Sequence, residues 1–417
     1  MTAFFDNLET RDPQQREAEN FASLPGFIAS AMDKAPGLRT WLDGCDVASI
    51  SDRGALSGLP VLRKPELMDM QAANPPFGGL ADPDALIGNR VFMSPGPVWE
   101  PQGFGADPWQ AARSLFAAGF RSGDRVHNSL SYHMTPGGFI LDEGARALGC
   151  LVFPAGIGNT EAQVEAAAVL QPTAYTGTPD YLKVLLDKAE ELGTDLSCIK
   201  RAMVSGGALF PAMREEYKNR GVSVLQSYAT ADIGMIAYES ADTDGNPHPG
   251  MILNENLIIE IVRPGTGDPV ADGEVGEIVV TSLNPAYPLI RFGTGDMTAV
   301  LEGLSPCGRT GTRIKGWLGR ADQRTKVKGM FVDPKQIAEI VKRHGDVSKA
   351  RLVVARDGDQ DVMVLHVEPN QGATPDAEAV ASSLSEVTKL KGTVQIAGTG
   401  TLPNDGKVIA DERDYDT

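Results

Sequence analysis

The clearest shortage in this 417-residue sequence is of positive charge. Lysine and arginine number 38 against 55 aspartates and glutamates, which gives a formal net charge of −17 at pH 7. Proteins that bind nucleic acid non-specifically, or that are held on anionic lipid by basic patches, need a basic surface. The composition therefore argues against a nucleic-acid partner and a membrane partner. It leaves room for a local basic site that binds a phosphorylated small molecule.

Cysteine is also scarce, and the four cysteines form no CxxC pair, which argues against a zinc ribbon and a dithiol redox motif. No apolar run approaches the roughly 20 residues of a membrane span. The N-terminal segment MTAFFDNLETRDPQQREAEN is acidic and lacks the apolar core of a signal peptide. We therefore expect a cytoplasmic protein with free thiols.

Two catalytic signatures are missing as well. No GxSxG nucleophile elbow occurs, and the five histidines show no metal-ligand spacing. Among the histidines, only His133 in SYHMTPGG follows a predicted strand closely enough to line a pocket. These absences argue against a serine hydrolase and a histidine-based metal centre.

What the sequence does contain is a regular alternation of helix and strand. The length suggests two or three domains, and the 42% hydrophobic content is enough for a sizeable core. Helical periodicity over 111–120, 137–149, 161–172, 181–193 and 210–221 alternates with strand-like segments at 125–130, 150–156, 173–179, 198–207 and 222–229. This pattern predicts an α/β fold with a parallel sheet, whose ligands bind at the carboxyl ends of the strands.

The regions on either side of this alternating segment differ from it in their predicted secondary structure. Before residue 100 the sequence is irregular, with helices expected over 17–31 and 35–42 and a loop over 74–88. After about Gly250, strand-rich segments predict an antiparallel β subdomain. From Gly319, two helices and several strands predict a small α+β domain. We therefore expect two domains, residues 1–318 and 319–417.

Two strand-end loops are candidates for the active site. SGGALF (205–210) and SYATADIG (227–234) lie one βαβ step apart, and glycines after a strand let the backbone approach a ligand closely. Asp232 stands where a carboxylate could hold a divalent cation between phosphates. Ordinary turn chemistry is the alternative reading, since glycine, serine and aspartate are common in such loops.

Further candidates lie nearer the C-terminus. Asp296 in FGTGDMT could accept hydrogen bonds from two adjacent ribose hydroxyls, or could be a β-turn aspartate. From Arg309 to Lys328 seven basic residues accompany one acid, which fits either a small polyanion site or a solvated hairpin. Lys407 stands alone in a polar loop, where most lysines are only exposed surface residues.

The order of these motifs is more specific than any one of them. SGGALFPAMREEY, SYATADIG, GEVGEIVVTSL, PLIRFGTGDMT, GRADQRTKVKG and a terminal GK occur in sequence. From about Gly88 to the C-terminus, the chain resembles the adenylate-forming acyl-CoA synthetase superfamily, and in particular its phenylacetate–CoA ligase branch.

This resemblance implies a reaction and its participants. The chain would be an AMP-forming acid–thiol ligase that uses ATP, Mg²⁺ and coenzyme A. A carboxylic acid, aromatic or aryl-acetic in this branch, would attack the α-phosphorus of ATP and give an acyl-adenylate and pyrophosphate. Rotation of a mobile C-terminal domain would then admit coenzyme A, whose thiol displaces AMP. Members of the family often form homodimers.

The resemblance also implies residue roles. Lys407, Asp232 and Arg320 would be catalytic, Asp232 would be the metal ligand and Asp322 the hinge. The nucleotide would contact Ser205, Gly206, Gly207, Ala208, Tyr228, Ala229, Thr230, Asp296, Arg320 and Lys326. The acyl pocket would be bordered by Tyr132, His133, Pro136 and Gly137.

One segment departs from the family pattern. A Ser/Thr/Gly-rich loop that cradles the outer phosphates of ATP should follow the strand 89–93, but the sequence there is SPGPVWEPQ, 94–102. Pro95 and Pro97 lack N–H donors, and Glu100 stands near the place of the loop's lysine. Three alternatives remain open: a ligase that binds ATP through other donors, an ATP-independent acyltransferase on the same scaffold, and a non-adenylating pseudo-ligase that binds nucleotide or acyl-CoA.

Overall fold

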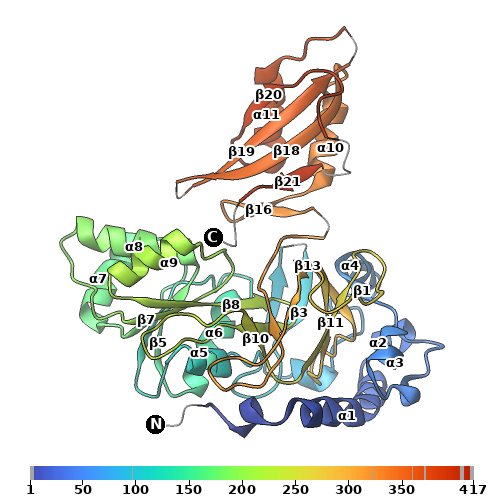
Figure 1. The fold of residues 1–417 in the computed structure, drawn as a ribbon, viewed down its shortest axis with the longest axis vertical. Coiled ribbons are helices and arrows are strands. Elements are labelled where there is room, and N and C mark those ends of the chain that lie inside the picture. Colours follow the sequence, from blue (N-terminus) through green and yellow to red (C-terminus); the bar gives the residue numbers. More distant parts are fainter. Residues whose placement is uncertain are drawn as a thin grey trace. The chain divides into compact units, whose positions relative to one another are not determined.

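The computed structural model describes residues 4–95, 97–321, 323–358, 360–370, 372–403 and 408–413. The chain divides into two compact units (Figure 1). The first comprises Met1–Thr294 and Thr298–Trp317, and the second comprises Gly295–Met297 and Leu318–Thr417. Each unit is described in turn.

The first unit is built on a nine-stranded sheet with the order β14-β15-β10-β9-β8-β7-β6-β4-β5. Its five strands from β8 to β5 are all parallel. The predicted α/β class and the parallel sheet are thus confirmed. The parallel strands are β4 (Arg125–Asn128), β5 (Leu151–Pro154), β6 (Ala174–Gly177), β7 (Arg201–Val204) and β8 (Ser223–Thr230).

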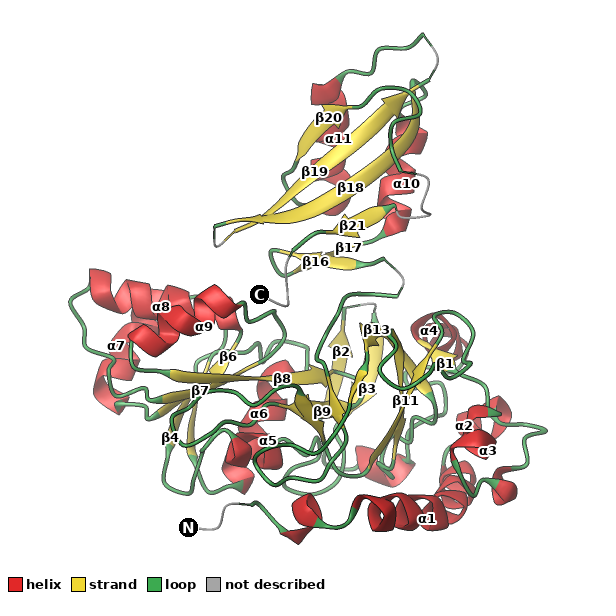
Figure 2. Cartoon of the chain, in the orientation of Figure 1, coloured by secondary structure: helices red, strands yellow, loops and turns green. Residues whose placement is uncertain are grey.

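Helices connect these strands, as the periodicity predicted (Figure 2). The four residues of β6 are all buried, as expected for a strand covered on both faces. Helix α8 shows the matching pattern, because Leu182, Leu185 and Ala189 are buried at helical spacing. The helices are α5 (Ala112–Ala117), α6 (Gly137–Ala147), α7 (Thr160–Leu170), α8 (Pro179–Glu191) and α9 (Pro211–Asn219).

Antiparallel strands extend the nine-stranded sheet beyond β8 and also form most of a second sheet, of order β1-β13-β12-β11. The expected antiparallel region is therefore present, and β11 and β12 pair over six residues. Strand β1 comes from the N-terminal region and pairs in parallel with β13. These strands are β1 (Leu62–Arg63), β9 (Gly234–Tyr238), β10 (Met251–Leu253), β11 (Leu257–Val262), β12 (Gly276–Ser282), β13 (Phe292–Thr298), β14 (Val300–Leu301) and β15 (Arg313–Ile314).

The N-terminal region is more helical than the sequence suggested. The expected helices are present as α1 and α2 and the expected strand 89–93 as β2, whereas α3, α4 and β3 are additional. Within 74–88, expected as loop, only the short helix η3 is regular. The elements are η1 (Asn7–Thr10), α1 (Pro13–Lys34), α2 (Pro36–Trp41), η2 (Val47–Ser49), α3 (Arg53–Ser57), α4 (Lys64–Ala73), η3 (Pro83–Leu86), β2 (Val91–Ser94) and β3 (Val98–Pro101).

The second unit is an α+β structure, as predicted. A β16–β17 hairpin precedes a sheet of order β20-β19-β18-β21, and α10 and α11 pack against each other and against this sheet. Leu352, Leu365 and Leu384 are fully buried in its own core. The elements are β16 (Thr325–Val327), β17 (Met330–Val332), α10 (Pro334–Arg343), β18 (Val347–Asp357), β19 (Gln360–Pro369), α11 (Ala377–Thr388), β20 (Thr393–Ile396) and β21 (Ile409–Asp411).

Candidate active site

The two predicted nucleotide loops follow neighbouring parallel strands. β7 and β8 pair from Arg201–Ser223 to Val204–Gln226, so Ser205 leaves the sheet where β8 continues through Ser227 and pairs with β9 as far as Thr230. The Ser205 hydroxyl donates to the Ser227 carbonyl over 3.0 Å and ties the loops together. The structure thus brings the first loop, Ser205 to Ala208, close to the end of β8 that carries Tyr228, Ala229 and Thr230.

The first loop has the open backbone that a flat ligand requires. Gly206 has φ +73°, a conformation that favours glycine, and a Cβ there would touch only Thr178 at 4.0 Å. Gly206 and Gly207 are exposed, and Ala208 is half-buried. The β8–β9 pairing shifts register between Tyr228 and Ala229, an irregularity of the kind that re-aims side chains at functional sites.

Asp232 lies in the turn between β8 and β9, and its side chain is fully buried. The ammonium of Lys64, the first residue of α4, lies 3.1 Å from Asp232 Oδ2. Within the described residues neither carboxylate oxygen accepts a hydrogen bond, so the contact is ionic. Two buried, unbonded carboxylate oxygens fit a ligand of a cation such as Mg²⁺. No larger cluster of metal-ligating side chains occurs in the described part of the chain.

Sequence reasoning missed Lys64 because no spacing signal links it to Asp232. Its place at the start of a short helix after β1 is set by the pairing of Leu62 and Arg63 with β13. A tertiary contact of this kind is not encoded in local periodicity.

The segment expected to be an irregular phosphate loop is instead mostly a β-hairpin. β2 and β3 pair from Val91–Pro101 to Ser94–Val98. Glu100 is buried, and its carboxylate accepts from the Ser94 hydroxyl over 2.5 Å and from the Ser94 N–H over 3.2 Å. Burial, and next the charge of Asp232, raise the pKa of Glu100 to about 8.

The predicted acyl-pocket residues lie in the connection from β4 to α6. Tyr132 is half-buried, and its hydroxyl donates to Asp142 Oδ2 over 2.7 Å while Asn128 donates to it over 2.6 Å. Burial and this bond to Asp142 raise the pKa of Tyr132. His133 is exposed, Pro136 is buried and Gly137 is the first residue of α6. The structure therefore holds the Tyr132 ring in one orientation and leaves His133 open to solvent.

Removing the Tyr132 hydroxyl should measure how firmly this network holds the ring. We expect Tyr132→Phe to lower the free energy of unfolding by about 1–2 kcal/mol, because the partly buried Asp142 and Asn128 lose their partner. Tyr181→Phe is the matched control, since Tyr181 bonds Gly158 O near the surface, and it should cost less than about 0.5 kcal/mol. Urea unfolding of both variants checks this, and equal losses would contradict it.

Asp296 and Arg320 lie together in the second unit. Arg320 Nη1 donates to Asp296 Oδ1 over 2.9 Å, and the two residues also form an isolated β-bridge. Gly295 has φ +74°, and a Cβ there would come within 2.6 Å of the Arg320 guanidinium. The positive φ and this close approach together give a physical reason for glycine at position 295. Asp322 and Lys407 lie outside the described residues.

The basic segment from Arg309 to Lys328 is not a single cationic surface. Buried Arg309 donates to Glu9 Oε1 over 2.6 Å, and buried Arg313 donates to the carbonyls of Pro249, Glu302 and Gly303. In the second unit, Arg324 pairs with Asp333, and Lys326 lies over the Phe331 ring. At least two of the seven charges are therefore structural, which corrects the reading of the whole run as a polyanion site.

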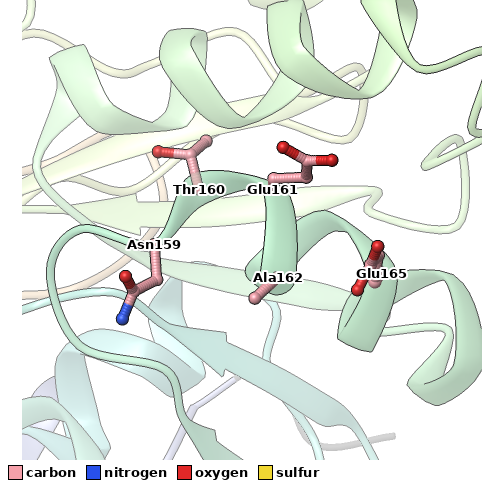
Figure 3. Close-up of a pocket in the computed structure, with 5 residues that line it drawn as sticks. All are labelled: Asn159, Thr160, Glu161, Ala162 and Glu165. Carbon is pink, nitrogen blue, oxygen red and sulfur yellow. The ribbon is translucent and has the colours of Figure 1, made fainter.

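A surface pocket of about 390 Å³ opens at the start of α7 (Figure 3). It carries none of the predicted site residues, and two of its side chains are acidic, so it offers no place for a phosphate. It is lined by Asn159, Thr160, Glu161, Ala162 and Glu165.

Two further features concern the thiols and the lengths of the helices. All four cysteines are free. No helix in the described ranges combines the length and the apolar character that a membrane span requires.

Comparison with known proteins finds an AMP-binding family model and phenylacetate-coenzyme A ligases. A family model described as AMP-binding enzyme matches residues 118–286. The phenylacetate-coenzyme A ligase of Pseudomonas putida is 31% identical over 385 residues, which are 88% of this chain and 84% of that protein. The phenylacetate-coenzyme A ligase of Escherichia coli K12 is 32% identical over 383 residues, 87% and 84% of the two chains.

A solved structure shows the same fold. A 2-hydroxyisobutyryl-CoA ligase, crystallised with 2-HIB-AMP and coenzyme A, superposes with a TM-score of 0.78 at 22% identity and covers 99% of this chain and 93% of that one.

Proposed function

Because the chain belongs to the phenylacetate–coenzyme A ligase family of adenylate-forming enzymes, we propose that it joins a carboxylic acid to coenzyme A with cleavage of ATP to AMP and pyrophosphate. The observation that carries this proposal is an identity of 31–32% to such ligases over seven-eighths of the chain. The acid is proposed to be aromatic or aryl-acetic, in keeping with these relatives.

The reaction proceeds in two steps. The acid's carboxylate oxygen attacks the α-phosphorus of ATP and forms a new O–P bond. The bond from the α-phosphorus to the oxygen that bridges it to the β-phosphorus breaks, and pyrophosphate leaves with that oxygen. The thiolate of coenzyme A then attacks the acyl carbon, and AMP leaves. Phosphoryl-centre chemistry of this kind depends on positioning and on neutralising charge.

The residues divide these tasks. The exposed backbone at Gly206 and Gly207 lies along the adenine, and Tyr228 flanks it. Asp296, oriented by Arg320, holds the ribose hydroxyls. Asp232 would hold Mg²⁺, which when bound neutralises phosphate charge.

Residues 319–417 act as a mobile lid, with Asp322 as the hinge and Lys407 as the lysine brought to the α-phosphate for adenylation only. A group needed in one half-reaction and withdrawn in the other requires such a moving element. Family membership also supports a cytoplasmic location and a homodimer.

Release of pyrophosphate on addition of carboxylic acids tests the proposal. Purified protein with ATP, Mg²⁺ and a panel of aryl-acetic, benzoic and short aliphatic acids should release pyrophosphate with at least one aromatic acid, and coenzyme A should convert the product to a thioester. Acid-independent release, or none from a folded sample, would contradict the ligase reading. Turnover of an acyl-CoA without ATP would instead indicate an acyltransferase.

A further inference from the structure

Among the described residues of the β2–β3 hairpin, Ser94 carries two donors that could cradle a phosphate, and both are already bonded within the chain. Phosphate-binding loops present backbone N–H groups, a hydroxyl and a lysine to the anion. Here both donors of Ser94, the hydroxyl and the N–H, point at the two carboxylate oxygens of Glu100. Glu100 places one carboxyl oxygen on each donor, so both donors are already occupied.

The other described residues at the tip of the hairpin and along β3 offer little to replace these donors. Pro95, Pro97 and Pro101 have no N–H. The Trp99 N–H donates to Gln71 Oε1 over 2.9 Å, and Gln71 Nε2 returns a bond to the Trp99 carbonyl over 2.8 Å. This two-way clamp fixes β3 to α4 and keeps Glu100 turned toward Ser94.

Charge at the hairpin is balanced internally. The Lys64 ammonium faces Asp232, and Glu100 lies close enough to both for their charges to act on it. One ammonium therefore faces two carboxyl groups, where a phosphate site would present an excess of positive charge. Among the residues that the structure describes here, a β,γ-diphosphate would meet the occupied donors of Ser94 and an ammonium that is already paired with Asp232.

We propose that Glu100 is an intramolecular substitute for the outer phosphates of ATP, and that it makes this site select an adenosine monophosphate group, as in AMP or an acyl-adenylate, over a triphosphate. The inference rests on the proposed function in one respect: it takes Asp232, whose charge acts on Glu100 of the hairpin, as part of the adenylate site. ATP still reacts, but it must displace Glu100 from Ser94, so ATP binds no more tightly than AMP.

Direct binding measurements test this without turnover. Isothermal titration with ATP and with AMP, both with Mg²⁺ and without acid or coenzyme A, gives two Kd values for each variant. Glu100→Ala frees the Ser94 donors, so the Kd for ATP should fall by about tenfold or more while that for AMP stays within about twofold. Glu274→Ala, which removes an exposed acid of the same unit, should leave both unchanged.

Ser94→Ala provides a second test of the proposal. This test does not require the buried Glu100 side chain to be removed. In the wild-type background it should alter the Kd for ATP by less than about twofold, because Glu100 already occupies the donors. In the Glu100→Ala background it should remove most of the gain. If Ser94→Ala alone weakens ATP by about fivefold or more, or if Glu100→Ala moves ATP and AMP equally or not at all, the proposal is wrong. Because nucleotide binding is measured without acid, this result is independent of whether pyrophosphate is released.

Discussion

Replacing Lys407 by alanine is expected to slow acyl-adenylate formation by about a hundredfold to a thousandfold, the range seen when one preorganised group that stabilises transition-state charge is lost. Thioester formation from supplied acyl-adenylate should stay within about fivefold, because the lysine is withdrawn in that step. Acid-dependent pyrophosphate release measures the first half-reaction, and thioester formation from synthetic acyl-adenylate and coenzyme A measures the second.

The control for Lys407 is Lys391→Ala, which removes an exposed lysine from the same unit. It should leave both half-reactions unchanged. Equal losses in the two half-reactions of Lys407→Ala would show that the residue acts through stability or general binding, and would contradict its role as a lysine specific to adenylation.

The second large effect is expected for stability, at Arg291. Its guanidinium is almost fully buried, pairs with Glu260 over 2.8 and 2.9 Å, and donates to the Ser57, Leu59 and Gly267 carbonyls. Removing one partner strands a buried charge, so Arg291→Ala should lower the free energy of unfolding by about 3–5 kcal/mol. Denaturant unfolding followed by circular dichroism measures this loss.

A matched variant at an exposed arginine separates the effect of losing a buried charge from the effect of losing a charge at the surface. Arg39 pairs with Asp33 where both side chains are more than half exposed, so Arg39→Ala should cost less than about 1 kcal/mol. If Arg291→Ala cost no more than Arg39→Ala, the buried network would not be holding the N-terminal helices onto the β11–β13 sheet as the structure indicates.

The predictable parts of the fold were those with a local signal. Helical spacing such as that of Leu182, Leu185 and Ala189 lies within one element. The loops after β7 and β8 could be placed together because parallel neighbours end at one sheet edge.

The parts that escaped prediction depend on distant partners. VWEP forms β3 because Gln71 clamps Trp99 and because Ser94 bonds Glu100, and neither contact has a sequence signature. The pairing of Lys64 with Asp232 is of the same kind.

The basic segment from Arg309 to Lys328 shows the same limit of prediction from sequence. Counting seven basic residues suggested a polyanion site, but the buried ion pair of Arg309 with Glu9 joins this segment to the N-terminal η1. An acid from the far end of the chain cancels a charge that composition alone assigned to a ligand. Composition therefore located the basic residues but could not assign their partners.

The most direct test of the central claim is to follow an oxygen atom. Turnover with an acid labelled with ¹⁸O in its carboxylate, together with ATP and coenzyme A, should place one labelled oxygen in the phosphate of AMP, because the acid oxygen that attacks the α-phosphorus stays there when the thiol displaces AMP. Label absent from AMP during thioester formation would contradict an acyl-adenylate route.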